Sequence, residues 1–150
     1  MPAELAISIK ARPHKAAFEF VFRVHYEDTD AAGIVYHANY LRYMERARTE
    51  WLSDLGIEID ELVKQHGIVF AVRSINVQYL RPARLNNHLI ATVWPERLGG
   101  ASLELDQRVF RDGELLTGAY LKLACVDANT LLPKAWPQVL LEVFNAWKTS

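Results

Sequence analysis

The sequence predicts an α+β domain in which an antiparallel β-sheet is covered by one long helix. Residues 17–27 alternate in polarity as a strand does, and residues 38–55 change to a helical period. Four further strand-like segments then follow, and most are separated by short connections, which favour antiparallel neighbours. A chain of 150 residues that is 51% hydrophobic can build one packed core. We therefore expect residues 1–150 to form a single domain, with an N-terminal extension at 1–16 and a terminal helix at 137–148.

The first strand and the helix are predicted from their periods. The apolar face of the segment "AFEFVFRVHYE" consists of Phe18, Phe20, Phe22, Val24 and Tyr26. The helical stripe of residues 38–55 consists of Leu41, Met44, Trp51, Leu52 and Leu55, and it stops at Gly56.

Two polar residues of this helix carry their own expectations. We expect Asn39 to cap its N-terminus. Arg48 falls inside the apolar stripe, where a charge needs a partner, and we expect an intrahelical ion pair with Glu45. The segment "IDELVKQHG" that follows favours a second, short helix.

The remaining strands are expected at residues 68–80, 88–98, 101–110 and 114–127, with a hairpin turn at Asp112-Gly113. The last of these strands is apolar on both faces, and its two faces are Leu115, Ala119, Leu121, Leu123 and Cys125, and Leu116, Tyr120, Ala124 and Val126. A strand of this kind is usually covered on both sides. Since one long helix cannot do this alone, we expect a homo-oligomer, a dimer or a tetramer.

Charge, composition and missing motifs exclude several classes of function. A net charge of −1 gives no reason to expect nucleic acid or an anionic membrane as a partner. No apolar run approaches the ~20 residues of a membrane span, and the N-terminus lacks the apolar core of a signal peptide. The single cysteine, Cys125, fits a buried position in a reducing compartment, so we expect a soluble, cytoplasmic protein. The histidines show no metal-ligand spacing, so no metal is expected. No nucleotide-binding or serine-hydrolase motif occurs either.

The stretch "EDTDAAGIVYHANY" at residues 27–40 has two readings. As local structure, its Asp and Thr residues and Gly33 suit a turn between a strand and a helix. As a site, it places Asp30 before the small residues Ala31 and Ala32 and close to the free N–H groups of a helix N-terminus. A carboxylate near backbone donors provides the parts needed for acyl transfer. Local chemistry alone leaves both readings open.

Two segments resemble a known family. The segment "VHYEDTDAAGIVYHANYLRYMERARTEWL" (24–52) resembles the signature of the hotdog-fold acyl-CoA thioesterases, within the 4-hydroxybenzoyl-CoA thioesterase-like group and nearest to its bacterial Tol-Pal-associated branch. The segment "VQYLRPARLNNHL" (77–89) is similar to a second, less specific motif of that group. The resemblance implies a hotdog fold, an antiparallel sheet wrapped around one long central helix. It also implies active sites that lie between subunits.

The resemblance assigns roles residue by residue. Asp30 takes the position of the catalytic carboxylate, as a nucleophile or as a general base, and the oxyanion donor is a backbone N–H at or near His37. The side chain of His37 either contacts the thioester carbonyl or lines the pocket. The substrate-binding positions are Tyr26, Gly33, Val35 and Tyr36, in which the two tyrosines are pocket walls or else core aromatics.

Other residues of these motifs are given more modest roles. Asp28 is expected to form the turn rather than to act as a second catalyst. Asn87 stands where the family often has aspartate, and we expect it to be a turn residue too. Arg81 and Arg84 are candidates for holding the phosphates of coenzyme A, with plain solvated surface charge as the alternative.

The sequence therefore predicts an acyl-CoA thioesterase that hydrolyses a short-chain thioester, with coenzyme A as part of the substrate and no separate cofactor. One alternative is an aromatic acyl-CoA thioesterase with the same mechanism. The other is a non-catalytic module that binds acyl thioesters or acyl carrier protein, and acyl carrier protein is also a partner to consider for the enzyme. A binding module has no use for a desolvated carboxylate beside a thioester, so Asp30 favours the enzyme.

Overall fold

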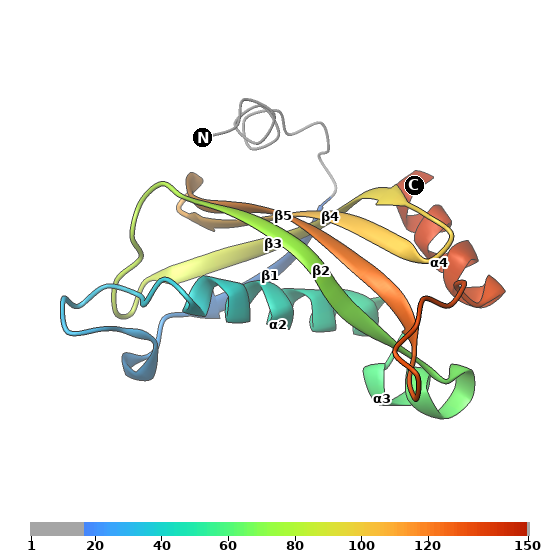
Figure 1. Cartoon of the computed structure of the whole chain (residues 1–150). Helices are drawn as coiled ribbons and strands as arrows, with labels where there is room; N and C mark the ends of the chain where they lie inside the picture. The colour runs from blue at the N-terminus through green and yellow to red at the C-terminus, as the bar shows by residue number, and fades with distance from the viewer. Residues whose placement is uncertain (1–16, 150) are drawn as a thin grey trace.

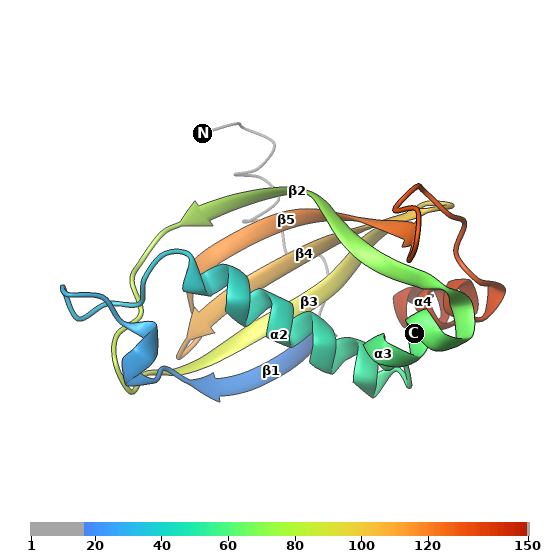
Figure 2. The ribbon, with the colours of Figure 1, turned by 60° about the horizontal axis from the view of Figure 1, so that its bottom comes forward.

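A computed structural model describes residues 17–149, so the predicted extension at 1–16 lies outside the described residues. The first half contains β1 (Phe18–Arg23), the 3₁₀ turn η1 (Tyr26–Asp28), α2 (Asn39–Asp54), α3 (Ile59–Glu61) and the π-helical turn η2 (Leu62–His66). The second half contains β2 (Ile68–Tyr79), β3 (His88–Leu98), β4 (Ser102–Arg111), β5 (Glu114–Asp127) and α4 (Gln138–Thr149). The strands form one antiparallel sheet that curves around α2 (Figures 1 and 2). This is the predicted hotdog architecture.

The strand order differs from the sequential neighbours that the short connections suggested. The order is β1-β3-β4-β5-β2, so β2 pairs with β5 and not with β3. Residues 80–87 carry the chain from β2 at one edge towards β3, next to the opposite edge (Figure 2). The prediction of sequential pairing is therefore wrong for β2 and correct for β3, β4 and β5, because only those three are joined by tight turns.

The long helix covers the concave face of the sheet. Its buried residues are Tyr40, Tyr43, Met44, Ala47, Trp51 and Leu52, which share Met44, Trp51 and Leu52 with the predicted stripe, whereas the predicted Leu41 and Leu55 are only half-buried. The helix ends at Asp54, and Gly56, just beyond the C-cap Leu55, has a φ of +86° that other residues rarely adopt. Ala38 occupies the N-cap position, and Asn39 instead donates its Nδ2–H to the carbonyl of Asp28 at 2.9 Å, so the predicted Asn39 cap is wrong.

The first strand is shorter than predicted, because the chain leaves the sheet before Tyr26. The backbone N–H of His25 donates to Asp28 Oδ2 at 2.9 Å and closes the 3₁₀ turn. Asp28 is 8% exposed and is the predicted turn former. Tyr26 is 82% exposed in the single chain, so the alternative that it is a core aromatic is wrong.

The last strand is buried on both faces, as its composition suggested, but with one shift. Phe110 pairs with Leu115 and Val109 pairs with Thr117, so Leu116 is the extra residue of a β-bulge. Its side chain therefore joins the core beneath the sheet and not the outer face, where the alternation placed it. On the outer face, Ala124 and Val126 are already buried within the single chain. This strand therefore gives no argument for self-association, and the predicted homo-oligomer needs another basis.

Candidate active site

The stretch that contains Asp30 folds as a tight hairpin between β1 and α2. The N–H of Asp30 donates to the carbonyl of Ile34 at 2.9 Å, and the N–H of Tyr36 donates to the carbonyl of Asp28 at 2.9 Å. Gly33 sits at the turn with φ +78° and has no atom within 4 Å of where a Cβ would stand, so its role in the chain is the backbone conformation. The hairpin therefore fixes Asp30 on a short, hydrogen-bonded scaffold.

The carboxylate of Asp30 is exposed at the tip of this hairpin. Its Oδ1 accepts a hydrogen bond of 2.8 Å from the N–H of Ala32, which is an Asx-turn contact. One carboxylate oxygen of Asp30 therefore forms the turn contact, and the other oxygen accepts no hydrogen bond from residues 17–149. Asp30 can act as a base or a nucleophile through that free oxygen.

The helix N-terminus lies directly after the hairpin. Asn39 donates its backbone N–H to the carbonyl of Tyr36 at 2.8 Å, but in the described part of the chain the N–H groups of His37 and Ala38 have no acceptor. Unused N–H groups at the positive end of a helix dipole stabilise developing negative charge. The hairpin and the helix start therefore bring a carboxylate and two backbone donors into one short segment.

A cavity of about 280 Å³ opens beside this segment. It is bounded by the helix start, by the end of β2 and by the loop that follows β2, and its lining residues are Ile34, Val35, His37, Tyr40, Tyr79, Leu80, Arg81 and Pro82. Among the predicted site residues it brings together Val35, His37 and Arg81. The other predicted residues lie outside this lining, and they are Asp30, Tyr26, Gly33, Tyr36 and Arg84.

His37 lies against two aromatic rings, of which only that of Tyr79 lines the cavity. Its ring centroid is 4.6 Å from that of Tyr36 and 6.1 Å from that of Tyr79. The hydroxyl of Tyr79 donates to the carbonyl of His37 at 3.0 Å, so the end of β2 is tied to the helix start. Tyr36 is 48% exposed, which excludes its alternative role as a core aromatic.

The loop at residues 80–87 is tied to the Asp30 hairpin. Its Ala83 accepts a hydrogen bond of 2.9 Å from the N–H of Val35 and donates its own N–H to the buried hydroxyl of Tyr40 at 2.9 Å. Burial raises the pKa of Tyr40, although the hydrogen bond from Ala83 partly opposes this rise. The loop is therefore hydrogen-bonded to both the hairpin and the helix.

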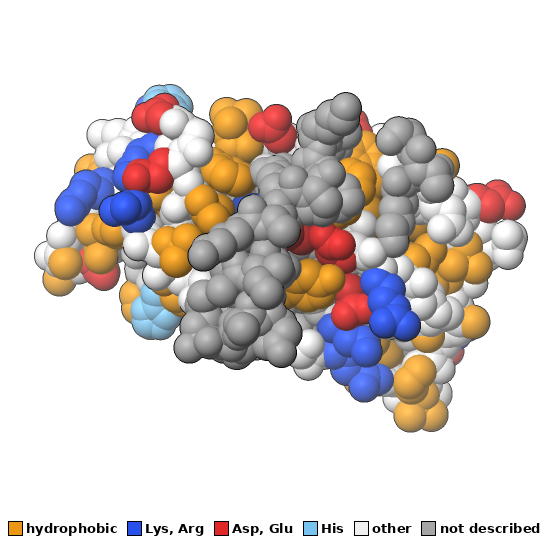
Figure 3. Space-filling view, turned by 90° about the horizontal axis from the view of Figure 1, so that it is seen from above, with side chains coloured by type: hydrophobic (Ala, Val, Ile, Leu, Met, Phe, Trp, Pro, Cys, Tyr) orange, Lys and Arg blue, Asp and Glu red, His pale blue; other side chains and the backbone are white. Residues whose placement is uncertain are grey.

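The arginines of the loop are placed differently from one another. Arg81 forms an ion pair with Glu114 at 3.0 Å and is 63% exposed, whereas the exposed side chain of Arg84 has no partner among the described residues. Arg111 also binds Glu114, at 2.9 Å. Basic and acidic side chains are grouped at this end of the outer face, the end where β4 and β5 are joined (Figure 3).

Asn87 acts as the predicted turn residue. Its Oδ1 accepts hydrogen bonds from the N–H of Arg84 at 2.7 Å and from Arg111 Nη1 at 3.1 Å. Arg111 Nη1 also donates to the carbonyl of Pro82 at 3.1 Å. Arg111, on β4, thus holds the whole loop, a role that no local pattern around it indicates.

Metal binding, thiol chemistry and membrane insertion each need features that can be looked for in the described residues. Across residues 17–149, no three His, Cys, Asp or Glu side chains are close enough together to hold a metal ion. Cys125 is buried, and burial raises the pKa of its thiol, so the thiolate that reactive chemistry needs is disfavoured. Within the same residues, no helix is both long and apolar enough to span a membrane.

Comparison with known proteins decides the family. The profile of the thioesterase-like superfamily matches residues 24–144. The chain belongs to the thioesterase-like superfamily. The match runs from the residue after β1 into α4, so it includes the Asp30 hairpin, the helix and the whole of the loop at 80–87.

Individual relatives agree with this assignment. The chain is 37% identical over 131 residues to the acyl-CoA thioesterase YbgC of Haemophilus influenzae, which covers 87% of this chain and 96% of that protein. A probable thioesterase from Bartonella henselae is 32% identical with a TM-score of 0.77, covering 81% of this chain and all of that one. A DHNA-CoA thioesterase from Staphylococcus aureus is 25% identical with a TM-score of 0.82, covering 89% and 91%. These likenesses confirm the predicted hotdog fold and the predicted class of thioester hydrolase, while the Tol-Pal association stays a prediction.

Proposed function

We propose that this superfamily member is an acyl-CoA thioesterase that hydrolyses short-chain acyl-CoA with Asp30 as its catalytic carboxylate. One observation carries the assignment of the residue. Asp30 presents an exposed carboxylate on a hairpin that is hydrogen-bonded directly ahead of the unpaired N–H groups of His37 and Ala38. Hydrolysis of a thioester needs an attacking or activating base and a donor for the oxyanion, and both are offered within one segment.

The reaction follows from these two parts. The thioester carbonyl oxygen accepts from the N–H groups at the helix start, which stabilise the negative charge as the tetrahedral intermediate forms. Asp30 either removes a proton from the attacking water or attacks the carbonyl carbon itself, giving an anhydride that water then opens. In both routes coenzyme A leaves as a thiolate that takes up a proton, from Asp30 where Asp30 acted as the base and from water where it acted as the nucleophile, and the acid product leaves as a carboxylate.

We infer that two copies of the chain pair through β2. This strand has 12 residues and forms one edge of the sheet, with β5 on one side and no strand of the described chain on the other. A long unpaired edge offers a row of free N–H and C=O groups to a second strand. Val72 and Tyr79 on this strand are also unusually exposed for such large side chains, at 54% and 47%. Sedimentation at micromolar concentration is expected to give a dimer or a tetramer, and an active monomer would refute this pairing.

Antiparallel pairing of β2 would bring two cavities together. The 280 Å³ cavity lies at the end of β2, by Tyr79, and a second cavity of about 210 Å³ lies at the start of β2, by Val69 and Val72. In an antiparallel pair the start of one strand lies beside the end of the other. The second cavity of one copy therefore adjoins His37 of the other copy and is suited to receive the acyl group.

The size of this second cavity supports a small acyl group. A dry apolar cavity of about 150 Å³ is known to hold benzene, so about 210 Å³ accommodates either a short chain or a single ring. An aromatic acyl-CoA is thus the second candidate substrate, and the likeness to the Staphylococcus aureus DHNA-CoA thioesterase favours it. Rates with acyl-CoA substrates of graded length and one aromatic member will separate the two.

The test of Asp30 is its replacement by Asn. The Asp30→Asn protein keeps an oxygen for the N–H of Ala32, so the fold is expected to persist, while kcat falls by the ~10²–10⁴-fold typical of a lost general base. Asp28→Asn is the matched control: it removes a buried charge that caps the 3₁₀ turn, so it is expected to lower stability more and kcat much less. An Asp30→Asn enzyme that remains oligomeric and hydrolyses acyl-CoA at nearly the wild-type rate would disprove this role.

A further inference from the structure

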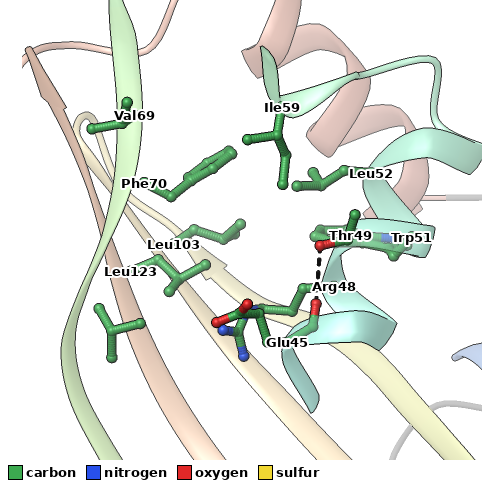
Figure 4. Close-up of a pocket in the computed structure, with 11 residues that line it drawn as sticks. Glu45, Arg48, Thr49, Trp51, Leu52, Ile59, Val69, Phe70, Leu103 and Leu123 are labelled. Atoms are coloured by element: carbon green, nitrogen blue, oxygen red, sulfur yellow. Dashed lines mark hydrogen bonds between the residues drawn. The ribbon is translucent and has the colours of Figure 1, made fainter. Parts of the chain in front are cut away.

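The second cavity, between α2 and β2, contains a cationic side chain that the proposed reaction does not use. Its walls are mostly apolar, and Figure 4 shows Phe70, Leu103, Leu123, Leu52 and Ile59 around it. Arg48 and Glu45 enter the same space from α2. An arginine in an apolar cavity is costly unless its N–H groups find acceptors.

The guanidinium of Arg48 is held from inside the protein. Its Nη1–H donates to Gln107 Oε1 at 2.9 Å. Gln107 is fully buried, and its Nε2–H donates to the carbonyl of Met44 at 2.9 Å. This chain from helix backbone to amide to guanidinium fixes the direction of Arg48, so the sheet, and not only the helix, sets its position.

The expected ion pair between Arg48 and Glu45 does not form, and the prediction is wrong. Within residues 17–149, the hydrogen bond to Gln107 is the one that the guanidinium makes, and no carboxylate lies within ion-pair distance of it. Burial lowers the pKa of Arg48, and the negative charge of nearby Glu45 opposes this shift without matching it. The remaining N–H donors of Arg48 are therefore available to a molecule in the cavity.

Resting on the function proposed above, we propose that Arg48 selects acyl groups that carry a neutral oxygen substituent, with a hydroxyl as the best fit. A hydroxyl accepts a hydrogen bond from Arg48 and can donate to the carboxylate of Glu45, which lines the same cavity. A saturated chain leaves the remaining N–H groups of the guanidinium without an acceptor in the cavity, and a terminal carboxylate meets the like charge of Glu45. The apolar walls accept the carbon chain in each case.

The experiment compares three substrates of similar length, 3-hydroxybutanoyl-CoA, butanoyl-CoA and succinyl-CoA, through their kcat/KM values. The wild-type enzyme is expected to favour the hydroxyacyl substrate over butanoyl-CoA by about tenfold or more, as when a buried charged donor gains an acceptor. Arg48→Met is expected to lose this preference and to act on butanoyl-CoA at least as well as the wild type. Arg48 is half-buried, and replacing a charge in an apolar setting by an apolar side chain of similar length is often tolerated, so the variant is expected to fold.

The control is Arg46→Met, on the same helix, since Arg46 is exposed and does not line the cavity. It is expected to keep the wild-type preference. The ratio of two substrates is measured within each protein, so partial unfolding cancels. Equal rates for the two uncharged substrates in the wild type, a preference for succinyl-CoA, or an unchanged ratio in Arg48→Met would each overturn the inference. Absence of hydrolysis of every acyl-CoA by the wild type would instead refute the proposed function itself.

Discussion

Arg111 is the residue whose replacement tests most directly how the loop at 80–87 is held against the candidate site. Its guanidinium bonds the carbonyl of Pro82, the side chain of Asn87 and the carboxylate of Glu114. The loop in turn supports the Asp30 hairpin through Ala83 and Val35. Arg111→Met keeps most of the aliphatic stem and removes all three hydrogen bonds.

The expected loss of stability can be built from these contacts. The side chains of Arg111 and Glu114 are 26% and 44% exposed, so we discount their ion pair to about 0.5 kcal/mol. Two hydrogen bonds to neutral oxygen acceptors contribute about 0.5–1 kcal/mol each. The sum is near 2 kcal/mol, which for a chain of this length lowers Tm by about 4–8 °C.

Thermal melting and steady-state kinetics check this prediction together. Since the loop forms a wall of the cavity by the helix start, KM for acyl-CoA is expected to rise as the loop loosens. Arg97→Met is the matched control, because the side chain of Arg97 is 81% exposed and its contact with Glu104 is long, at 3.8 Å. If the two variants melted at the same temperature as the wild type, Arg111 would not be holding the loop.

Two further predictions follow from the same region. Tyr40→Phe leaves the buried N–H of Ala83 without an acceptor and is expected to lower the free energy of unfolding, measured by denaturant titration, by about 1–3 kcal/mol. Tyr79→Phe loses only a surface contact to His37 and is expected to cost less, so equal losses in the two variants would contradict this account. Replacing both Arg81 and Arg84 by Ala is expected to raise KM for acyl-CoA, and to raise KM much less for the matching pantetheine thioester, which lacks the nucleotide phosphates. Equal increases in KM for the two substrates would argue against phosphate binding.

The sequence by itself determined the secondary structure and the family. The helical period of residues 38–55 corresponds to α2, because that helix buries one stripe, and the apolar segments 88–98 and 114–127 correspond to β3 and β5. The Asp112-Gly113 hairpin was also readable, since positive φ at both positions needs just these residue types. The motif around Asp30 indicated the thioesterase family, since its spacing is local and long enough to be specific.

The tertiary structure alone decided how distant segments meet. The pairing of β2 with β5, and hence the free edge at β2, depends on contacts between residues far apart in sequence, which no local period encodes. For the same reason the partner of Arg48 was predicted wrongly: the helix offered Glu45, but the fully buried Gln107, from β4, has an oxygen within reach and no exposure to water. Arg111 was missed because its three acceptors come together only after the loop has folded back on the sheet. A buried polar group bonds the acceptor that packing brings closest, and packing is a property of the whole fold.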